Sequence, residues 1–136
     1  MPSIEHEIKI SATPDRIFAA LSDAEDLEGW EGGKVTLKGD VIEIVYPGGP
    51  TFRWRTRRVG DTAIAWRCLD GPGQSPGTEV RFDVSPADRG RSLVELTHFG
   101  WRDTGGNYRK CNTHWGALLH GLKAWIEAGR RSAHFS

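Results

Sequence analysis

Apolar and polar residues alternate over residues 4–10, with isoleucine or histidine at every even position and glutamate or lysine between them. This period of two predicts a β-strand with one buried face. Thr13 can then cap a helix that has Pro14 as its first residue. A short apolar stripe follows, and a polar break at residues 22–23 separates it from a second run over 24–30. The pattern therefore predicts two short helices after the first strand.

The period of two returns at Gly32 and continues to Trp101. Segments rich in Gly, Pro and Asp interrupt it, which is typical of turns between strands. Connections this short exclude parallel neighbours, since parallel strands need a longer crossover, so we expect an antiparallel meander. The six predicted strands run over residues 34–38, 41–46, 51–59, 62–69, 78–85 and 91–99.

Each predicted strand has two unlike faces. In the strand over 62–69, Trp66 and its even-numbered neighbours form an aromatic and apolar face, while Ala63 and Ala65 fall on the outer face with charged residues. The apolar face must be covered by another element. Residues 107–128 place apolar side chains at helical spacing, and Gly129 is a typical helix stop. Such a helix is roughly 33 Å long, enough to cross the whole sheet.

Together these elements predict one α+β domain over residues 1–136. Its sheet is curved, seven-stranded and antiparallel, and it wraps around the long C-terminal helix, with the two short helices after strand 1. A chain of 136 residues has room for one core of ordinary size.

Charge and cysteine content narrow the class of protein. The 18 Lys and Arg residues balance the 18 Asp and Glu residues, so we expect no nucleic-acid partner, which would require a basic excess. No apolar stretch approaches the roughly 18 residues of a membrane span, and the N-terminus lacks a signal pattern. Cys68 and Cys111 lie in separate elements, as expected for buried thiols in a reducing compartment. We therefore expect a cytoplasmic protein without membrane insertion.

The aromatic content points to a candidate site. The chain has six Trp, five Phe and two Tyr, and rings this large are either packed in a core or used for binding. A strongly bent sheet around one helix tends to leave space on its concave side. We therefore expect a ligand pocket between the sheet and the first half of the helix. The candidate ligand-binding residues are Trp30, Phe52, Trp54, Trp66, Phe82, His98, Tyr108, Cys111, Asn112 and Trp115.

His98 and Asn112 are the polar groups among these candidates, and each would be costly to bury without a partner. In one interpretation they orient a ligand in an otherwise apolar pocket. In the other they bond to each other, to Tyr108 or to a trapped water molecule. Both interpretations are open from the sequence.

Four parts of the chain carry a family resemblance: residues 11–18, residues 23–30, residues 94–101, and, in the last helix, Trp115, Leu118 to Leu122, Lys123 and Gly129. With the order of elements, they resemble the helix-grip (SRPBCC) superfamily, which includes START domains, the birch-pollen-allergen proteins and polyketide cyclases. More narrowly, the chain is similar to the AHSA-like branch, named after the C-terminal domain of the activator of the heat-shock-protein-90 ATPase. The resemblance specifies the fold and leaves the chemistry open, because members share a pocket but not a function.

The resemblance implies binding of a small hydrophobic or amphipathic molecule, without a cofactor. Two alternatives are an interaction module for the heat-shock-protein-90 chaperone, linked to the stress response, and a cyclase-like or hydrolase-like enzyme on a cyclic substrate. The eukaryotic activator uses a separate N-terminal domain for much of its chaperone contact, which these residues do not include, and this weakens the expectation of chaperone activation. Both a monomer and a homodimer fit the sequence.

Acid–base catalysis needs two titratable groups in the pocket. The sequence offers His98, Tyr108 and Cys111 but predicts no carboxylate on the concave face, so an enzyme is the less favoured hypothesis. Cys111 and His114, three residues apart on a helix, are the best metal-ligand pair, with Cys68 or His98 as a third. Structural zinc normally needs two such close pairs, so we expect no metal.

Overall fold

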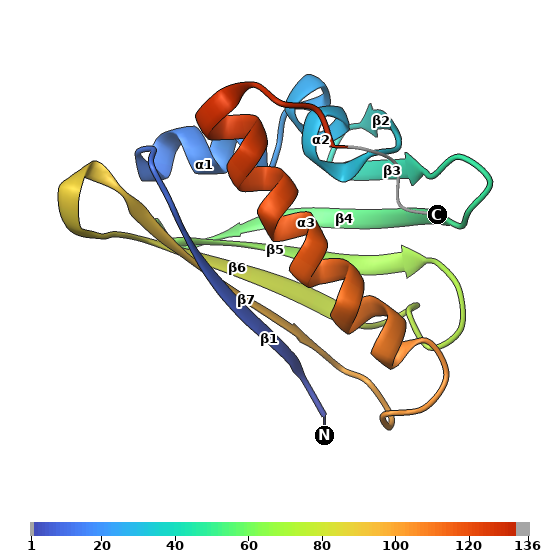
Figure 1. Ribbon diagram of the computed structural model, residues 1–136. Coiled ribbons are helices and arrows are strands. Elements are labelled where there is room, and N and C mark those ends of the chain that lie inside the picture. The colour runs from blue at the N-terminus through green and yellow to red at the C-terminus, as the bar shows by residue number, and fades with distance from the viewer. Residues whose placement is uncertain (1, 133–136) are drawn as a thin grey trace.

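The predicted elements occur in the predicted order in a computed structural model of the chain, which describes residues 2–132. Figure 1 shows their arrangement. The helices are α1 (Pro14–Ala20), α2 (Ala24–Glu31) and α3 (Tyr108–Ala128). The strands are β1 (Ile4–Ile10), β2 (Lys34–Lys38), β3 (Val41–Val45), β4 (Thr51–Val59), β5 (Ala63–Asp70), β6 (Glu79–Pro86) and β7 (Ser92–Phe99), with a short 3-10 turn at Asp88–Gly90.

The strands form one antiparallel sheet in the order β1-β7-β6-β5-β4-β3-β2. This confirms the predicted fold: the six later strands are a meander, and β1 pairs with β7 at one edge. The sheet is strongly twisted, with α3 lying across its concave face and α1 and α2 covering one end (Figure 1). The backbone of α3 approaches α2 and β1 most closely. Large side chains therefore fill the space between α3 and the central strands.

The helix boundaries follow from local chemistry. Thr13 caps α1 as predicted, because its Oγ1 accepts a hydrogen bond from the Arg16 backbone N at 3.3 Å. Helix α2 continues one residue beyond the predicted end, through Glu31. It stops where Gly32 adopts φ 79° and ψ 12°, a left-handed conformation that glycine takes without steric cost. This extra residue places Glu31 on the last turn of α2, facing the interior.

The concave face of the sheet is buried as predicted, but part of the outer face is also buried. Ala63 and Ala65 alternate with the concave-face residues of β5 as predicted, but they are 0% exposed, unlike the charged residues that share the outer face with them. Ala65 lies opposite Arg57 on β4 and opposite Arg81 on β6. The long arginine side chains cover the small alanine methyl group between them.

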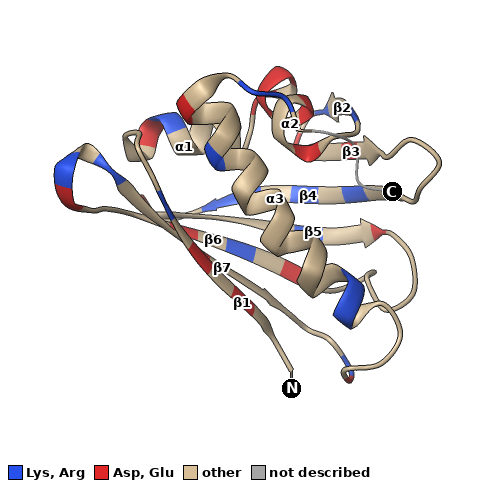
Figure 2. Cartoon of the chain, viewed as in Figure 1, with Lys and Arg blue, Asp and Glu red and all other residues tan. Residues whose placement is uncertain are grey.

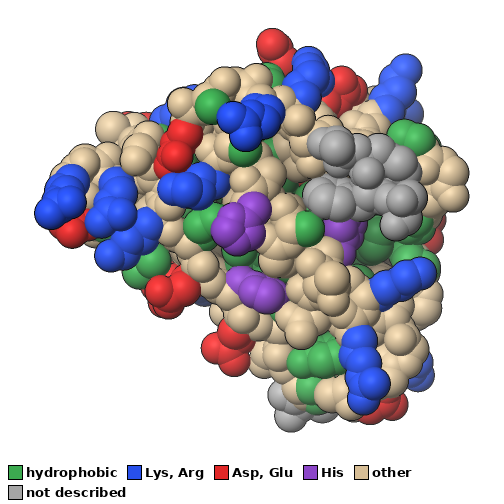
Figure 3. Space-filling view, viewed as in Figure 1, with side chains coloured by type: hydrophobic (Ala, Val, Ile, Leu, Met, Phe, Trp, Pro, Cys, Tyr) green, Lys and Arg blue, Asp and Glu red, His purple; other side chains and the backbone are tan. Residues whose placement is uncertain are grey.

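Figure 2 shows residues of both charges along β4 to β7, and their alternation with buried residues places them on the outer face of the sheet. Arg57 pairs with Glu79 across the sheet at 2.7 Å, and Arg81 pairs with Asp83 at 3.0 Å. In the space-filling view, histidine side chains gather over the middle of α3 and charged side chains lie toward the rim (Figure 3). Within residues 2–132, no helix is both long enough and apolar enough to span a bilayer.

Candidate functional site

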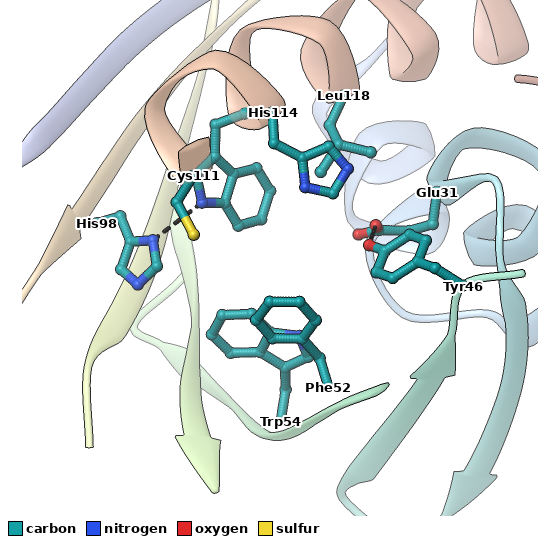
Figure 4. Close-up of a pocket in the computed structure, with 9 residues that line it drawn as sticks. Glu31, Tyr46, Phe52, Trp54, His98, Cys111, His114 and Leu118 are labelled. Carbon is teal, nitrogen blue, oxygen red and sulfur yellow. Dashed lines mark hydrogen bonds between the residues drawn. The ribbon is translucent and has the colours of Figure 1, made fainter. Parts of the chain in front are cut away.

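A small cavity lies between the first half of α3, the β3–β4 region and the end of α2 (Figure 4). The space into which a water molecule fits measures about 20 Å³. The whole hollow, with the part that is open to solvent, measures about 300 Å³. The inner volume holds about one water molecule, so an organic occupant requires lining side chains to move. The lining residues are Glu31, Tyr46, Phe52, Trp54, His98, Cys111, His114, Trp115 and Leu118.

Glu31 and Tyr46 form the polar end of the cavity. Glu31 ends α2, Tyr46 follows β3, and the Tyr46 hydroxyl donates a hydrogen bond to the Glu31 Oε1 atom. Glu31 is 1% exposed and Tyr46 is 6% exposed. Burial raises the pKa of Glu31 to about 7, although the bond from Tyr46 acts in the opposite direction. Burial, with the nearby carboxyl, also raises the pKa of Tyr46, so its hydroxyl keeps the proton that it donates.

Aromatic rings from β4 and α3 form the floor and one wall. Phe52 and Trp54 lie two residues apart on β4, so both side chains point to the concave face. Their rings are stacked, with centroids 5.6 Å apart and an angle of 4° between planes. Trp115 reaches down from α3, and its ring centroid is 6.4 Å from that of Trp54. A register shift between β4 and β5 at Arg53/Trp54 adds local twist just where this floor lies.

His98 holds the Trp115 ring in place. The Trp115 indole N–H donates to His98 Nδ1 at 2.9 Å, so the imidazole proton is on Nε2, which donates to the Thr78 hydroxyl at 2.7 Å. The Thr78 hydroxyl in turn donates to the Ser75 carbonyl at 2.7 Å. Burial lowers the pKa of His98 to about 3, which keeps the ring neutral. Both ring nitrogens therefore have protein partners, and His98 acts on the cavity through Trp115.

The thiols and His114 are neutral groups at ordinary pH. Burial raises the pKa of Cys111 to about 11 and that of Cys68 to about 12, so neither thiol has the low pKa of a nucleophilic cysteine. Burial lowers the pKa of His114, whose ring contacts the Tyr46 ring edge-on at 5.4 Å between centroids. Within the described residues, no group of three or more His, Cys, Asp or Glu side chains is arranged to hold a metal ion.

Five of the ten candidate residues from the sequence lie in the lining. Three others form a core behind it: Trp30, Trp66 and Phe82 are each 0% exposed. The Trp66 ring lies 6.1 Å from that of Trp30 and 5.0 Å from that of Phe82, measured between centroids. The residues that do line the cavity are Phe52, Trp54, His98, Cys111 and Trp115.

Tyr108 and Asn112 lie outside the lining. The Tyr108 hydroxyl donates to the Ser3 carbonyl at 2.9 Å. Asn112 is exposed, and its Oδ1 atom lies 2.9 Å from His6 Nε2 on β1. One residue along a helix turns the side chain by about 100°. Cys111 therefore faces the cavity, whereas Asn112 faces the edge strand.

Sequence reasoning missed four lining residues: Glu31, Tyr46, His114 and Leu118. The expectation that no carboxylate faces the concave side was wrong, because Glu31 does. A local signal existed for Glu31: it follows Trp30, a predicted inward residue, and precedes Gly32-Gly33, a typical helix stop. A helix extended by one residue would have placed this carboxyl beside a buried tryptophan.

Comparisons with known proteins agree with the fold. The model of the family described as "Polyketide cyclase / dehydrase and lipid transport" matches residues 1–131. The solved Aha1 dimer from Colwellia psychrerythraea is 27% identical and superimposes with a TM-score of 0.83, covering 95% of this chain and 98% of that one. No curated protein matches the sequence significantly.

Two further solved structures are more distant in sequence. DynU16, a protein of the dynemicin biosynthetic locus, is 14% identical with a TM-score of 0.78; the match covers 97% of this chain and 49% of DynU16. A Mesorhizobium loti protein is 18% identical with a TM-score of 0.76, over 93% of this chain and 97% of that one. These two similarities concern the fold alone.

Proposed function

Because the chain belongs to the polyketide cyclase / dehydrase and lipid transport family, within the SRPBCC superfamily, we propose that it binds a small hydrophobic or amphipathic molecule between α3 and the sheet. The ligand would enter where Glu31, Tyr46, Phe52, Trp54 and Trp115 meet. Family membership supports the class of ligand, and the cavity supports its location.

The observation that carries the proposal is a polar pair buried among rings. A carboxyl that is 1% exposed is costly to bury, and among the described residues only the Tyr46 hydroxyl gives Glu31 a hydrogen bond. Aromatic walls with a few placed polar groups are the usual composition of a small-molecule site. The small inner volume means that binding must move side chains, and Tyr46 and Phe52 keep 6% and 7% exposure at the outer side.

Ligand-induced gain in melting temperature tests this proposal. We expect at least one compound from a panel of lipids, aromatic molecules and polyketides to raise the melting temperature of the purified chain. The same compound should change tryptophan fluorescence, since Trp54 and Trp115 line the cavity. A protein indifferent to the whole panel would contradict the proposal.

A variant that fills the cavity supplies the control. Cys111→Phe adds a ring inside the lining, and Thr113→Phe adds the same ring on the exposed side of α3. The ligand effect should disappear in Cys111→Phe and persist in Thr113→Phe. If the larger residue prevents folding, Cys111→Leu gives a smaller intrusion. Equal binding by all variants would place the ligand elsewhere.

A second candidate function is proton transfer, favoured by the position of Glu31. A carboxyl with pKa about 7 is suited to accept a proton at neutral pH. With a cyclic ketone such as 2-tetralone in D2O, the Glu31 carboxylate would remove an α-proton and leave the enolate. The Glu31 carboxyl would exchange that proton with D2O, and the enolate would take up a deuteron from it, which restores the ketone and the carboxylate. NMR follows this exchange. Exchange at equal rates in wild type and Glu31→Gln would eliminate Glu31 as the base.

The chaperone hypothesis remains a prediction, favoured by the similarity to the Colwellia Aha1 dimer. We propose the outer face of the sheet as the contact surface in that case. A pull-down with purified heat-shock-protein-90 tests the partner, and light scattering distinguishes a monomer from a homodimer. Failure to retain the chaperone would end this alternative without affecting the ligand site.

A further inference from the structure

The nine lining residues of the cavity include one carboxyl and no Lys or Arg. The two histidines are neutral, because burial lowers the pKa of His98 to about 3 and also lowers that of His114. Tyr46 and Cys111 keep their protons, because burial raises the pKa of each. At neutral pH the lining therefore carries no positive charge, and Glu31 is its one source of negative charge.

The surrounding rings add to this electrostatic preference. The face of an aromatic ring carries partial negative charge and attracts a cation within about 6 Å of its centroid. Phe52 and Trp54 are stacked on the floor, and Trp115 lies above them at 6.4 Å from Trp54. Figure 4 shows Glu31 and Tyr46 on one side of the hollow and the Phe52 and Trp54 rings below it. Rings and carboxyl thus face a common space.

The Glu31 carboxyl also has free capacity for a hydrogen bond. Within residues 2–132, its one hydrogen-bond partner is the Tyr46 hydroxyl, which is bonded to Oε1. Arginine and lysine partners balance other partly buried carboxylates of this protein, such as Glu79 with Arg57. Glu31 has no such partner among the described residues. A ligand with a positively charged donor would supply it.

We propose that the cavity accepts a small amphipathic amine, whose protonated nitrogen binds the Glu31 carboxylate while its apolar body stacks on Phe52 and Trp54. This assignment rests on the proposed function and narrows the ligand class. It disfavours carboxylates and phosphates, which the ionised Glu31 would repel and which no cationic lining residue would hold.

Three probes of similar shape test the assignment by calorimetry with the full chain: 2-phenylethylamine, 2-phenylethanol and 3-phenylpropionate. Near pH 8 the amine should bind at least about tenfold more tightly than the alcohol, and the carboxylate should bind more weakly than both. Binding of the amine near pH 6 should release up to one proton, because the ammonium group favours ionised Glu31. Titration in two buffers of different ionisation enthalpy measures that proton.

Glu31→Gln keeps the shape of the site and removes its charge. In this variant the preference for the amine should fall to within about twofold, and proton release should disappear. Glu25→Gln is the matched control, since Glu25 is an exposed residue of the same helix; it should bind as wild type does. Tyr46→Phe, which removes the hydroxyl alone, gives a second variant if Glu31→Gln fails to fold.

The outcomes separate this inference from the proposed function. If the alcohol or the carboxylate binds as tightly as the amine, or if Glu31→Gln keeps the preference, the amine assignment is wrong and ligand binding stands. If no probe binds and the wider panel also leaves the melting temperature unchanged, both are wrong.

Discussion

Two clusters of aromatic rings lie beneath α3, and they differ in what surrounds each ring. The inner cluster, Trp30, Trp66 and Phe82, is 0% exposed and lies in the hydrophobic core. The outer cluster, Tyr46 and Phe52 with Trp54, is 4% to 7% exposed and includes the buried Glu31 carboxyl. The same residue types therefore form a solid core in one place and a cavity wall in the other.

The difference comes from the backbone beneath the rings. Trp66 stands on β5 and Phe82 on β6, in the middle of the sheet. The Trp30 ring of α2 contacts Trp66, and the Trp115 ring of α3 contacts both Trp66 and Phe82. The outer rings stand on and beside the β3–β4 hairpin, where α2 has ended and α3 begins. Whether an aromatic residue belongs to a packed core or to a cavity wall therefore depends on the elements that surround it, which the residue type alone does not show.

The largest expected contrast is in stability. Trp66→Ala in the inner cluster should lower the free energy of unfolding by about 3 to 5 kcal/mol, the usual cost of a large cavity in a packed core. Phe52→Ala should cost at least about 1 kcal/mol less, because the space it leaves adjoins an existing hollow and solvent. Urea unfolding of both variants measures the difference. Equal losses would mean that the outer cluster is as solidly packed as the inner one.

The buried carboxyl gives the outer cluster a pH dependence that the inner one lacks. Glu31 has a pKa of about 7 in the folded protein, against an ordinary value of 4.5, so the folded state holds this proton more tightly than the unfolded state. Its effect on stability is therefore most favourable below about pH 4.5 and is lost as pH rises to about 7. The difference is worth on the order of 3 kcal/mol.

Glu31→Gln removes this dependence. Relative to wild type, the variant should gain roughly 3 kcal/mol of unfolding free energy between about pH 4.5 and pH 8. His98 contributes in the opposite direction, since its pKa of about 3 makes the folded state lose stability as pH falls below 6.5. That contribution is common to both proteins and cancels in the difference. A pH-independent difference would show that Glu31 is not buried as an acid.

The fold was predictable because its signals are local. Alternation and turn residues placed each strand within one residue of its observed bounds, and Thr13 marked the start of α1 correctly. Predicted alternation also put Phe52 and Trp54 on the concave face, where they line the cavity. Ala65 is the exception, because it is buried on the outer face. Its burial depends on arginines from the two neighbouring strands, which the sequence pattern of one strand does not show.

The site was only partly predictable because it depends on where elements meet. Glu31 carries a charge and sits at a helix end, and such residues are exposed by default; only the approach of Tyr46 from another element makes it part of the lining. Asn112 was misleading for a related reason. The sequence placed it among the candidate pocket residues, but the side of α3 that carries Asn112 lies close to β1, where its side chain contacts His6.

The smallest contrast separates the two polar contacts that α3 makes with the sheet. Trp115→Phe removes the N–H that His98 accepts in the buried interior, and should cost about 1 to 3 kcal/mol because His98 Nδ1 is left without its donor. Asn112→Ala removes the exposed contact with His6, and should cost less than about 1 kcal/mol. Urea unfolding gives both values.

Nitrogen NMR of His98 adds a measurement that loss of packing alone would not change. In the neutral range, wild type should show only the tautomer with the proton on Nε2, and Trp115→Phe should also populate the tautomer with the proton on Nδ1. If Asn112→Ala proved the more costly change, the exposed contact and not the His98–Trp115 bond would be the main polar attachment of α3.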